Sequence, residues 1–358
     1  MKTYLIIIPQ LNYDGPIKGA IALANSLYRK KLDVKLIIFK NNKSSIPFLL
    51  NSIEVINLDK KANNLYKKIK YYRSYIRNLI NQKKNNSIIA ISYCLEADLL
   101  NYFSLKEVKK ICSMRADIFQ NYYYNYGLIG YVLAYFHYKI ITKFSIVIAM
   151  HDEMRKQIRN YYLGKIIIIN NFVDEIYLSK FKKKLNKTNI KKIIFVGKLN
   201  KRKNPISSIN IFAKLLENDK DLRLEIIGTG PLLEQLKERV KFYKIRKFVH
   251  FHGFKKNPYD LISDSDILIL PSFSEGMSRA LIEAQFFGII SVIKDHASLR
   301  LIKKGNSNLI TYQNSNSLYN SMKLAIKRSR NKIYRKKNLL PLSFSQSYCV
   351  DRFVKFIK

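Results

Sequence analysis

The stretch from Asp266 to Gly288, which reads DILILPSFSEGMSRALIEAQFFG, is the most informative part of the chain. An apolar run, Asp266–Leu270, stops at Pro271, a short polar loop follows, and apolar residues then recur at helical spacing from Met277. This pattern predicts a strand, a loop and a helix that starts near Gly276. In open α/β sheets such junctions lie at the carboxyl edge of the strands, where ligands bind, and the N–H groups of a helix start favour an anion such as phosphate.

Two glutamates, Glu275 and Glu283, lie on either side of this predicted helix start. Eight residues of helix would separate them by about 12 Å, whereas the carboxylate pair of a glycosidase needs about 5 to 9.5 Å. A hydrolytic pair is therefore disfavoured. Each carboxylate can instead accept hydrogen bonds from hydroxyls on separate parts of one extended ligand, while the N–H groups of Gly276, Met277 and Ser278 face an anionic centre. These properties describe a binding site for a sugar nucleotide.

Two further strand-to-helix loops have residues suited to phosphate. A basic run from Gly197 to Pro205, which includes Lys198 and Lys203, directly follows a strand candidate and is well placed to neutralise a diphosphate. A solvated Lys-rich turn remains the alternative for these residues. Gly228-Thr229-Gly230-Pro231 follows the next strand candidate, and taken alone it is a turn as often as a ligand contact.

Strand-like runs alternate with helix-like runs along the whole chain. In the first half the strand candidates are Tyr4–Ile8, Val34–Phe39, Ile53–Leu58, Ile88–Ser92, Ile111–Ser113, Ile146–Met150 and Ile166–Ile169. In the second half they are Lys192–Val196, Leu224–Ile227, Val249–Phe251, Ile267–Leu270 and Ile290–Ile293. Two rounds of alternation predict two doubly wound α/β domains. We expect domains at residues 1–176 and 192–341, a charged linker at 177–191, and a C-terminal helix at 342–358.

The composition narrows the class of protein. The 358 residues fit two domains, and 65 Lys and Arg against 25 Asp and Glu give a net charge of +40. Such a charge attracts nucleic acid, anionic lipid or a phosphorylated substrate, although an AT-rich coding sequence also explains it. Three scattered cysteines argue against a disulfide framework or a zinc site and favour a reducing cytosol. Neither a signal peptide nor a membrane span is expected.

Taken together, these residues resemble the retaining glycosyltransferases of the GT4 family, which have the GT-B fold. The resemblance covers roughly Ile193 to Gly305 and depends on motifs in family order and spacing. They are Gly197, Lys198 and Lys203, then Gly228-Thr229-Gly230-Pro231, Gly253, Asp266, and the two glutamates within PSFSEG and EA. It implies two Rossmann-like domains that face each other across a cleft, with the C-terminal helix crossing back to the N-terminal domain.

The resemblance also implies roles for individual residues. Lys198 and Lys203 would hold the donor diphosphate and act with Glu275, which would contact the donor sugar, while Glu283 would contact the nucleotide ribose. The segment from Asn12 to Gly19 resembles the family's glycine-rich loop near the donor phosphates, although it could be a simple helix cap. The full set of expected donor-binding residues is Gly15, Gly197, Gly228, Gly230, Gly276, Met277, Ser278 and Glu283.

The sequence also departs from the family pattern. Lys198 replaces the usual Arg, so a bidentate phosphate contact becomes a point charge. Ser278 stands where Gly or Pro is frequent, and Ile290 replaces a usual Pro. The frequent active-site histidine after the fifth strand is absent, so Met114 and Arg115 are the candidates for the acceptor side. His137 and His151 are expected to be structural or to lie on the surface.

Two segments are candidates for membrane contact. Lys60 to Lys84 spaces apolar residues along one helical face and basic residues elsewhere, so this helix could lie on anionic lipid or pack on the sheet. The aromatic segment from Tyr122 to Phe136 is too short to span a bilayer. It could form a buried helix or border a groove for a lipid-linked acceptor.

The expected function is transfer of a sugar from a nucleotide-sugar donor to a hydroxyl of a lipid-linked or oligosaccharide acceptor in capsule, O-antigen or other surface polysaccharide synthesis. A UDP-sugar is the expected donor, no metal or cofactor is implied, and the enzyme is expected in the cytoplasm, peripheral on the inner face of the cytoplasmic membrane. The enzymatic alternatives are a sugar-nucleotide epimerase and a phosphorylase of the same fold. The non-catalytic alternative is a basic protein that binds nucleic acid or membrane; nucleic acid is not an expected partner, because no reading module is present.

Overall fold

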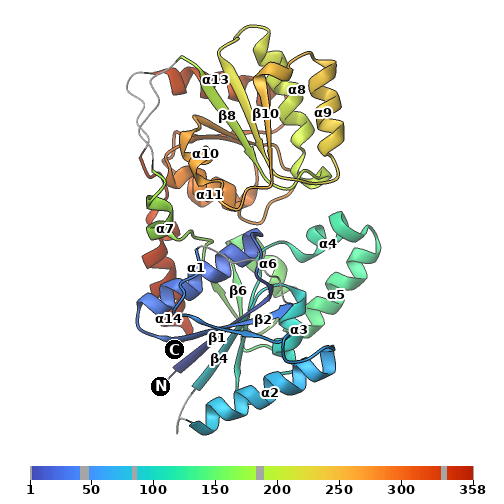
Figure 1. Ribbon diagram of the computed structural model, residues 1–358, viewed down its shortest axis with the longest axis vertical. Helices are drawn as coiled ribbons and strands as arrows, with labels where there is room; N and C mark the ends of the chain where they lie inside the picture. Colours follow the sequence, from blue (N-terminus) through green and yellow to red (C-terminus); the bar gives the residue numbers. More distant parts are fainter. Residues whose placement is uncertain (1, 41–47, 83–86, 183–188, 332–336, 358) are drawn as a thin grey trace. The chain divides into compact units, whose positions relative to one another are not determined.

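The computed structural model describes residues 2–40, 48–82, 87–182, 189–331 and 337–357. Contacts divide the chain into two compact units, Met1–Asp174 with Ser343–Lys358 (unit 1) and Glu175–Leu342 (unit 2). Each unit is one parallel sheet with helices on both faces (Figure 1). The expectation of two doubly wound α/β domains is therefore confirmed.

Unit 1 has the sheet order β3-β2-β1-β4-β5-β6-β7. Its strands are β1 Lys2–Gln10, β2 Asp33–Lys40, β3 Glu54–Asn57, β4 Ser87–Ser92, β5 Lys109–Ser113, β6 Ile146–Ala149 and β7 Lys165–Ile168. Its helices are α1 Gly15–Arg29, α2 Leu65–Gln82, α3 Leu95–Tyr102, α4 Ile118–Tyr126, α5 Ile129–Ile141, α6 Asp152–Arg159 and α14 Gln346–Ile357. The strands are runs rich in Ile because helices bury both faces of a parallel sheet.

Unit 2 has the order β10-β9-β8-β11-β12-β13. Its strands are β8 Lys191–Val196, β9 Leu222–Ile227, β10 Val249–Gly253, β11 Ile267–Leu270, β12 Ile290–Lys294 and β13 Leu309–Tyr312. Its helices are α7 Glu175–Ser179, α8 Pro205–Leu216, α9 Leu233–Phe242, α10 Tyr259–Asp264, α11 Arg279–Phe286, α12 Arg300–Lys303 and α13 Ser315–Arg330. Strand β13 was not predicted, although its run Leu-Ile-Thr-Tyr has the composition of a strand.

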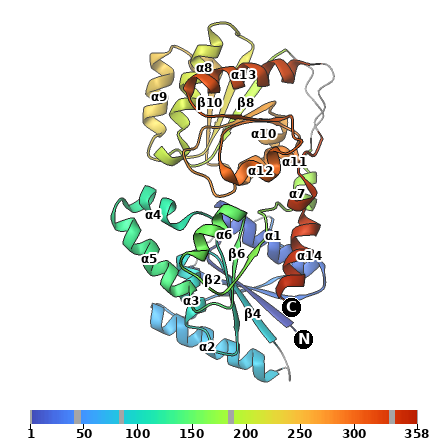
Figure 2. The ribbon, with the colours of Figure 1, turned by 180° about the vertical axis from the view of Figure 1, so that it is seen from behind.

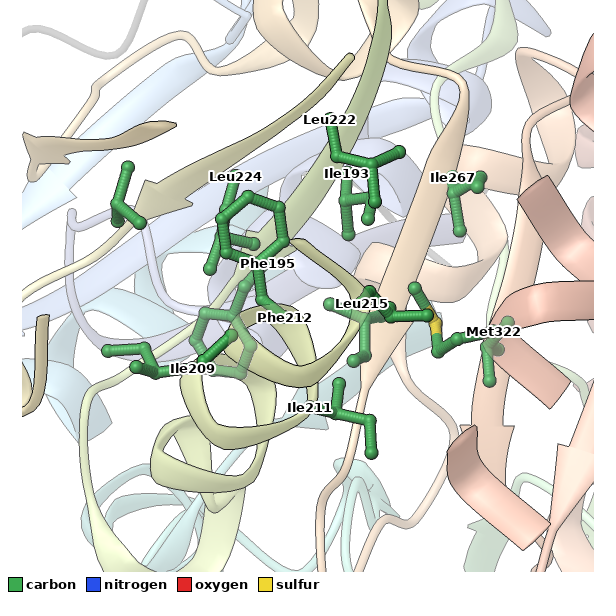
Figure 3. Packing of buried hydrophobic residues seen from close by; sticks show 14 of the residues in the cluster. Ile193, Phe195, Ile209, Ile211, Phe212, Leu215, Leu222, Leu224, Ile267 and Met322 are labelled. Carbon is green, nitrogen blue, oxygen red and sulfur yellow. The ribbon is translucent and has the colours of Figure 1, made fainter. Parts of the chain in front are cut away.

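A large hydrophobic core lies between one face of the unit 2 sheet and helices α8, α9 and α13. In Figure 3, Phe195 and Leu224 of the sheet pack against Phe212 of α8. Helices α10 and α11 pack against each other, and α11 also contacts β11 and β12. Figure 2 shows α10 and α11 from behind.

The C-terminal helix α14 belongs to unit 1, as expected. Gln346 Nε2 donates to Ser26 Oγ of α1 at 2.8 Å, and Arg352 Nε donates to the Ile168 carbonyl at 2.8 Å. Phe353 packs on Tyr4 of β1. The chain thus returns to its first unit after completing the second. The expected linker 177–191 contains the end of α7, and its residues 183–188 lie outside the described residues.

The two candidate membrane segments have different environments. The apolar face of α2 packs on the sheet, where Tyr72 and Ile76 are fully buried; Lys84, at the end of the predicted helix, lies outside the described residues. The aromatic segment forms most of a hairpin of α4 and α5 with many exposed side chains, and it is not a buried helix. No helix in the described part of the chain is long and apolar enough to cross a membrane.

Candidate functional site

The strand order of unit 2 reverses between β8 and β11, which are neighbours in the sheet although their connections run in opposite directions. At such a switch point the connections leave the two strands towards opposite faces of the sheet, and ligands of open α/β sheets bind beside the loops there. The loop after β8 contains Lys198 and Lys203, and the loop after β11 contains Glu275. Asp266 fixes the other end of this strand pair, because its carboxylate accepts from the Lys192 N–H at 2.9 Å.

The loop after β8 has a fixed shape. The Asn200 side chain accepts from the backbone N–H of Lys203 at 3.1 Å and caps a single 3₁₀ turn, Lys201–Lys203. Asn204 then adopts a left-handed conformation with φ of 49°, which Asn tolerates better than most residues, and Pro205 begins α8. With this geometry the side chains of Arg202 and Lys203 point towards the loop after β11.

Lys203 and Glu275 form an ion pair between their side-chain ammonium and carboxylate groups. Their side chains are only 14% and 7% exposed, so water screens the pair weakly. Arg202 joins them, because its guanidinium lies 3.6 Å from the Glu275 carboxylate and donates to the Ser274 carbonyl at 2.7 Å. The backbone N–H of Phe273 donates to the Arg202 carbonyl at 2.8 Å, which closes the two loops on each other.

The pKa values of this pair reflect burial and mutual attraction. Burial would raise the pKa of the Glu275 carboxyl, but Lys203 and Arg202 outweigh that effect and hold this pKa below its ordinary value. Burial lowers the pKa of the Lys203 ammonium, and Glu275 opposes that shift. Glu275 is therefore an ionised carboxylate at neutral pH. It can accept hydrogen bonds from hydroxyls, and it is unsuited to act as a general acid.

Glu283 has a different environment from Glu275. It lies on α11, is buried, and pairs with the guanidinium of Arg279 one turn earlier at 3.2 Å. The hydroxyl of Tyr259 lies 3.5 Å from the same carboxylate oxygen. The two glutamates therefore occupy two separate polar positions, each paired with its own cation.

The glycines of this edge let three loops approach each other. Gly228 has φ of 143°, and a Cβ there would lie 1.9 Å from the Gly197 carbonyl oxygen. A Cβ on Gly230 would lie 2.5 Å from the Leu199 carbonyl oxygen. These loops also share backbone hydrogen bonds, from Leu199 N–H to the Thr229 carbonyl and from Gly228 N–H to the Gly253 carbonyl, both at 2.9 Å. The motif glycines thus have a packing role, whichever ligand the edge binds.

Helix α11 starts later than the sequence indicated. Its first residue is Arg279, and the Ser278 side chain caps it by accepting from the Leu281 N–H at 3.5 Å. Gly276, Met277 and Ser278 therefore belong to the loop before the helix, because a Ser cap competes well for the N-terminal boundary. Met277 and Ser278 are buried, and Gly276 is partly exposed.

Two residues of this edge were not predicted as site residues. Arg202 was part of the quoted basic run but was not selected. His296 follows β12, and its Nε2 lies 3.2 Å from the Ser272 carbonyl in the Glu275 loop. Burial lowers the pKa of the His296 imidazole, which favours its neutral form.

Lys198, which the sequence did predict as a site residue, is exposed in the loop that contains Lys203.

In unit 1 the expected residues also lie at a carboxyl edge. The strand order reverses between β1 and β4, and Gly15 is the first residue of α1, where a Cβ would meet nothing within 4 Å. Arg115 follows β5, stacks over the Tyr93 ring at 4.9 Å, and donates to its hydroxyl at 3.1 Å. The Arg115 Nε is buried and finds no hydrogen-bond partner among the described residues.

The structure also places the other unit 1 residues that the sequence analysis named. Met114 is buried in the core, and its N–H donates to the Ile148 carbonyl at 3.1 Å. His137 is buried and lies 2.8 Å from the Asp98 carboxylate. His151 caps α6 by accepting from the Met154 N–H at 3.3 Å. Both histidines are structural, in line with the sequence.

Comparison with known proteins agrees with this architecture. The family "Glycosyl transferases group 1" matches residues 178–338. A Campylobacter jejuni protein named GalNAc-alpha-(1->4)-GalNAc-alpha-(1->3)-diNAcBac-PP-undecaprenol alpha-1,4-N-acetyl-D-galactosaminyltransferase is 24% identical over 87% of this chain and 84% of its own length. An Escherichia coli UDP-Gal:alpha-D-GlcNAc-diphosphoundecaprenol alpha-1,3-galactosyltransferase is 29% identical over 42% of each chain.

Solved structures show the same fold over the whole length. The crystal structure of Anabaena HepE in complex with UDP-glucose superposes with a TM-score of 0.74, at 14% sequence identity, and the match covers 99% of both chains. These relatives are consistent with the two doubly wound units and with the glycine and basic motifs of unit 2. Residues 178–338 therefore match the group 1 glycosyl transferases, and the chain has the GT-B fold over its whole length.

Proposed function

We propose that this glycosyltransferase moves a sugar from a UDP-sugar to a hydroxyl of a glycan linked to a polyprenyl diphosphate, and does so with retention of anomeric configuration. The observation that supports the donor site most strongly is the cluster of Lys203, Arg202 and Glu275 at the switch point of unit 2. Two cations beside one buried carboxylate suit a ligand that combines a diphosphate with sugar hydroxyls.

Each residue has a defined role in this proposal. Lys203, with Lys198 in the same loop, stabilises the charge that develops on the departing diphosphate. The N–H groups of Gly276, Met277 and Ser278 add to that stabilisation. Glu275 holds the donor sugar, Glu283 the ribose, and the loops at Gly15, Gly197, Gly228 and Gly230 let the backbone approach the donor.

In the reaction, the bond between the anomeric carbon and the diphosphate oxygen breaks as the acceptor oxygen bonds to the same face of that carbon. The acceptor proton passes to an oxygen of the departing diphosphate, so no protein base is needed. Arg115 is the proposed acceptor-side residue, since its guanidinium retains an unused buried donor. A lipid-linked acceptor is supported by the names of both relatives above.

The site of action is proposed to be the cytoplasmic membrane, on its inner face, with the enzyme bound peripherally. The net charge of +40 supports attraction to anionic lipid. Binding to anionic vesicles should weaken as salt increases, because salt screens this attraction.

The test is a transfer assay in which NMR reads the anomeric configuration of the product. The proposal predicts a new α-linked sugar from an α-linked donor, formed only when donor and acceptor are both present. An epimerase would change the donor without an acceptor, and a phosphorylase would require inorganic phosphate. Either result, or a product of inverted configuration, would contradict the proposal.

A further inference from the structure

Helices α4 and α5 form a hairpin whose composition differs from that of the rest of the chain. From Ile118 to Tyr138 the sequence contains no Asp, Glu, Lys or Arg, whereas a quarter of the whole chain is charged. Figures 1 and 2 both show the two helices side by side at the edge of unit 1. The absence of charge over all of α4 and most of α5 needs an explanation other than burial, because the outer surface of this hairpin is exposed.

The inner surface of the hairpin is firmly packed. The backbones meet closely at Gly130, where a Cβ would lie 2.4 Å from the backbone of Tyr122. The His137 Nδ1 lies 3.0 Å from the Tyr122 hydroxyl, and its Nε2 lies 2.8 Å from the Asp98 carboxylate of α3. Ala134 is fully buried. The hairpin therefore has a fixed orientation, and its outward side chains are not displaced core residues.

The outer surface presents large apolar side chains almost without interruption. Those of Leu128, Ile129 and Val132 are 78%, 71% and 69% exposed. The complete set of exposed large apolar residues on the hairpin is Tyr123, Tyr124, Tyr126, Leu128, Ile129, Tyr131, Val132, Tyr135 and Phe136. A contiguous patch of this kind on a protein is a site of interaction with another apolar surface.

The charges around this patch favour a lipid bilayer as its partner. On α5 the exposed apolar residues recur every three or four positions, and the same face ends at Lys139, whose ammonium lies over the Tyr135 ring at 5.2 Å. Lys143 follows one turn later and is exposed. Apolar and Tyr side chains with Lys at the border are typical of a segment that enters the interface of an anionic membrane. A second copy of this chain would also carry a charge of +40, so repulsion disfavours a dimer.

We propose that the outer face of the α4–α5 hairpin inserts into the headgroup and upper acyl region of an anionic bilayer and anchors the enzyme there. This inference deepens the proposed function, since it names the surface that would bring unit 1 to a lipid-linked acceptor. It differs from attraction by net charge alone, because apolar insertion persists at salt concentrations that screen charge.

The absence of Trp from the chain allows a direct test. Phe136→Trp places a single indole on the hairpin, and Phe242→Trp places one at an exposed position of α9 in unit 2 as the matched control. With vesicles containing phosphatidylglycerol, the Phe136→Trp emission should shift to the blue and be quenched by brominated acyl chains, also at high salt. The Phe242→Trp emission should not change. Equal responses of both indoles, or none at position 136, would overturn the proposal.

A second experiment separates membrane anchoring from catalysis. Each of Tyr131→Ser, Val132→Ser and Phe136→Ser should weaken vesicle binding on the order of tenfold, because each removes one apolar side chain from the lipid. Transfer to a water-soluble acceptor should remain unchanged. Unaltered vesicle binding would refute insertion while leaving the proposed function intact. Self-association that the same substitutions abolish would instead identify a second copy as the partner and refute the bilayer.

Discussion

Lys203 and Glu275 form a buried ion pair although 72 positions separate them in the chain. The contact exists because β8 and β11 are neighbours at the switch point of the unit 2 sheet, so the loops after them meet. This relationship brings together the basic motif and the acidic motif. It is the basis of the donor site proposed here.

The first prediction concerns removal of either partner. Lys203→Ala and Glu275→Ala should each lower kcat/KM on the order of 10²- to 10³-fold, because each removes an interaction with the developing charge or the donor sugar. Circular dichroism should show that both proteins stay folded. The exposed pair Glu234 and Lys237 of the same unit is the control, and its alanine variants should keep normal activity. Normal activity of Lys203→Ala or Glu275→Ala would contradict the assignment of that residue to the donor site.

The second prediction concerns acid stability. The folded-state pKa of Glu275 lies below its ordinary value of 4.5, so its ionised form contributes stability above about pH 4.5, and that contribution disappears as pH falls through the folded-state pKa. Urea unfolding between pH 3 and 6 should therefore show a steeper loss of stability in the wild-type protein than in Glu275→Gln. Parallel curves for the two proteins would mean that the pair does not hold the carboxyl ionised.

The third prediction separates packing from ligand approach at two glycines. Gly228→Ala should destabilise unit 2 by about 1 to 3 kcal/mol, since a Cβ collides with the Gly197 carbonyl in a backbone conformation unfavourable to Ala. Gly15→Ala has no steric conflict, so its melting temperature should match that of the wild type. Donor KM should nevertheless increase in Gly15→Ala if the donor phosphates approach this backbone. An unchanged KM would remove Gly15 from the donor site.

The fourth prediction concerns the acceptor. Arg115→Lys retains the charge but loses the guanidinium that stacks on Tyr93, so KM for the acceptor should increase several-fold. Calorimetry should give an unchanged donor affinity. If donor affinity falls while acceptor KM is constant, Arg115 belongs to the donor site.

The sequence predicted the strands well because buried parallel strands are short runs of Ile and Val that contrast with their polar surroundings. It misplaced the start of α11 because Gly276 and Ser278 are both plausible boundary residues, and only the hydrogen bond to Leu281 identifies the cap. Arg202 and His296 were missed because their proximity to the Glu275 loop depends on which strands are neighbours. The exposure of the α4–α5 hairpin could not be predicted from the sequence either, since apolar spacing alone does not distinguish a buried face from an exposed one.

The most direct test of the central claim is a transfer assay with a panel of UDP-sugars and a glycan acceptor linked to polyprenyl diphosphate, run in parallel for the wild type and Glu275→Ala. We predict that the wild-type enzyme extends the acceptor by one sugar from at least one donor, and that Glu275→Ala does so on the order of 10²- to 10³-fold more slowly. Extension at equal rates by both proteins would contradict the account, as would donor binding without transfer in the wild type.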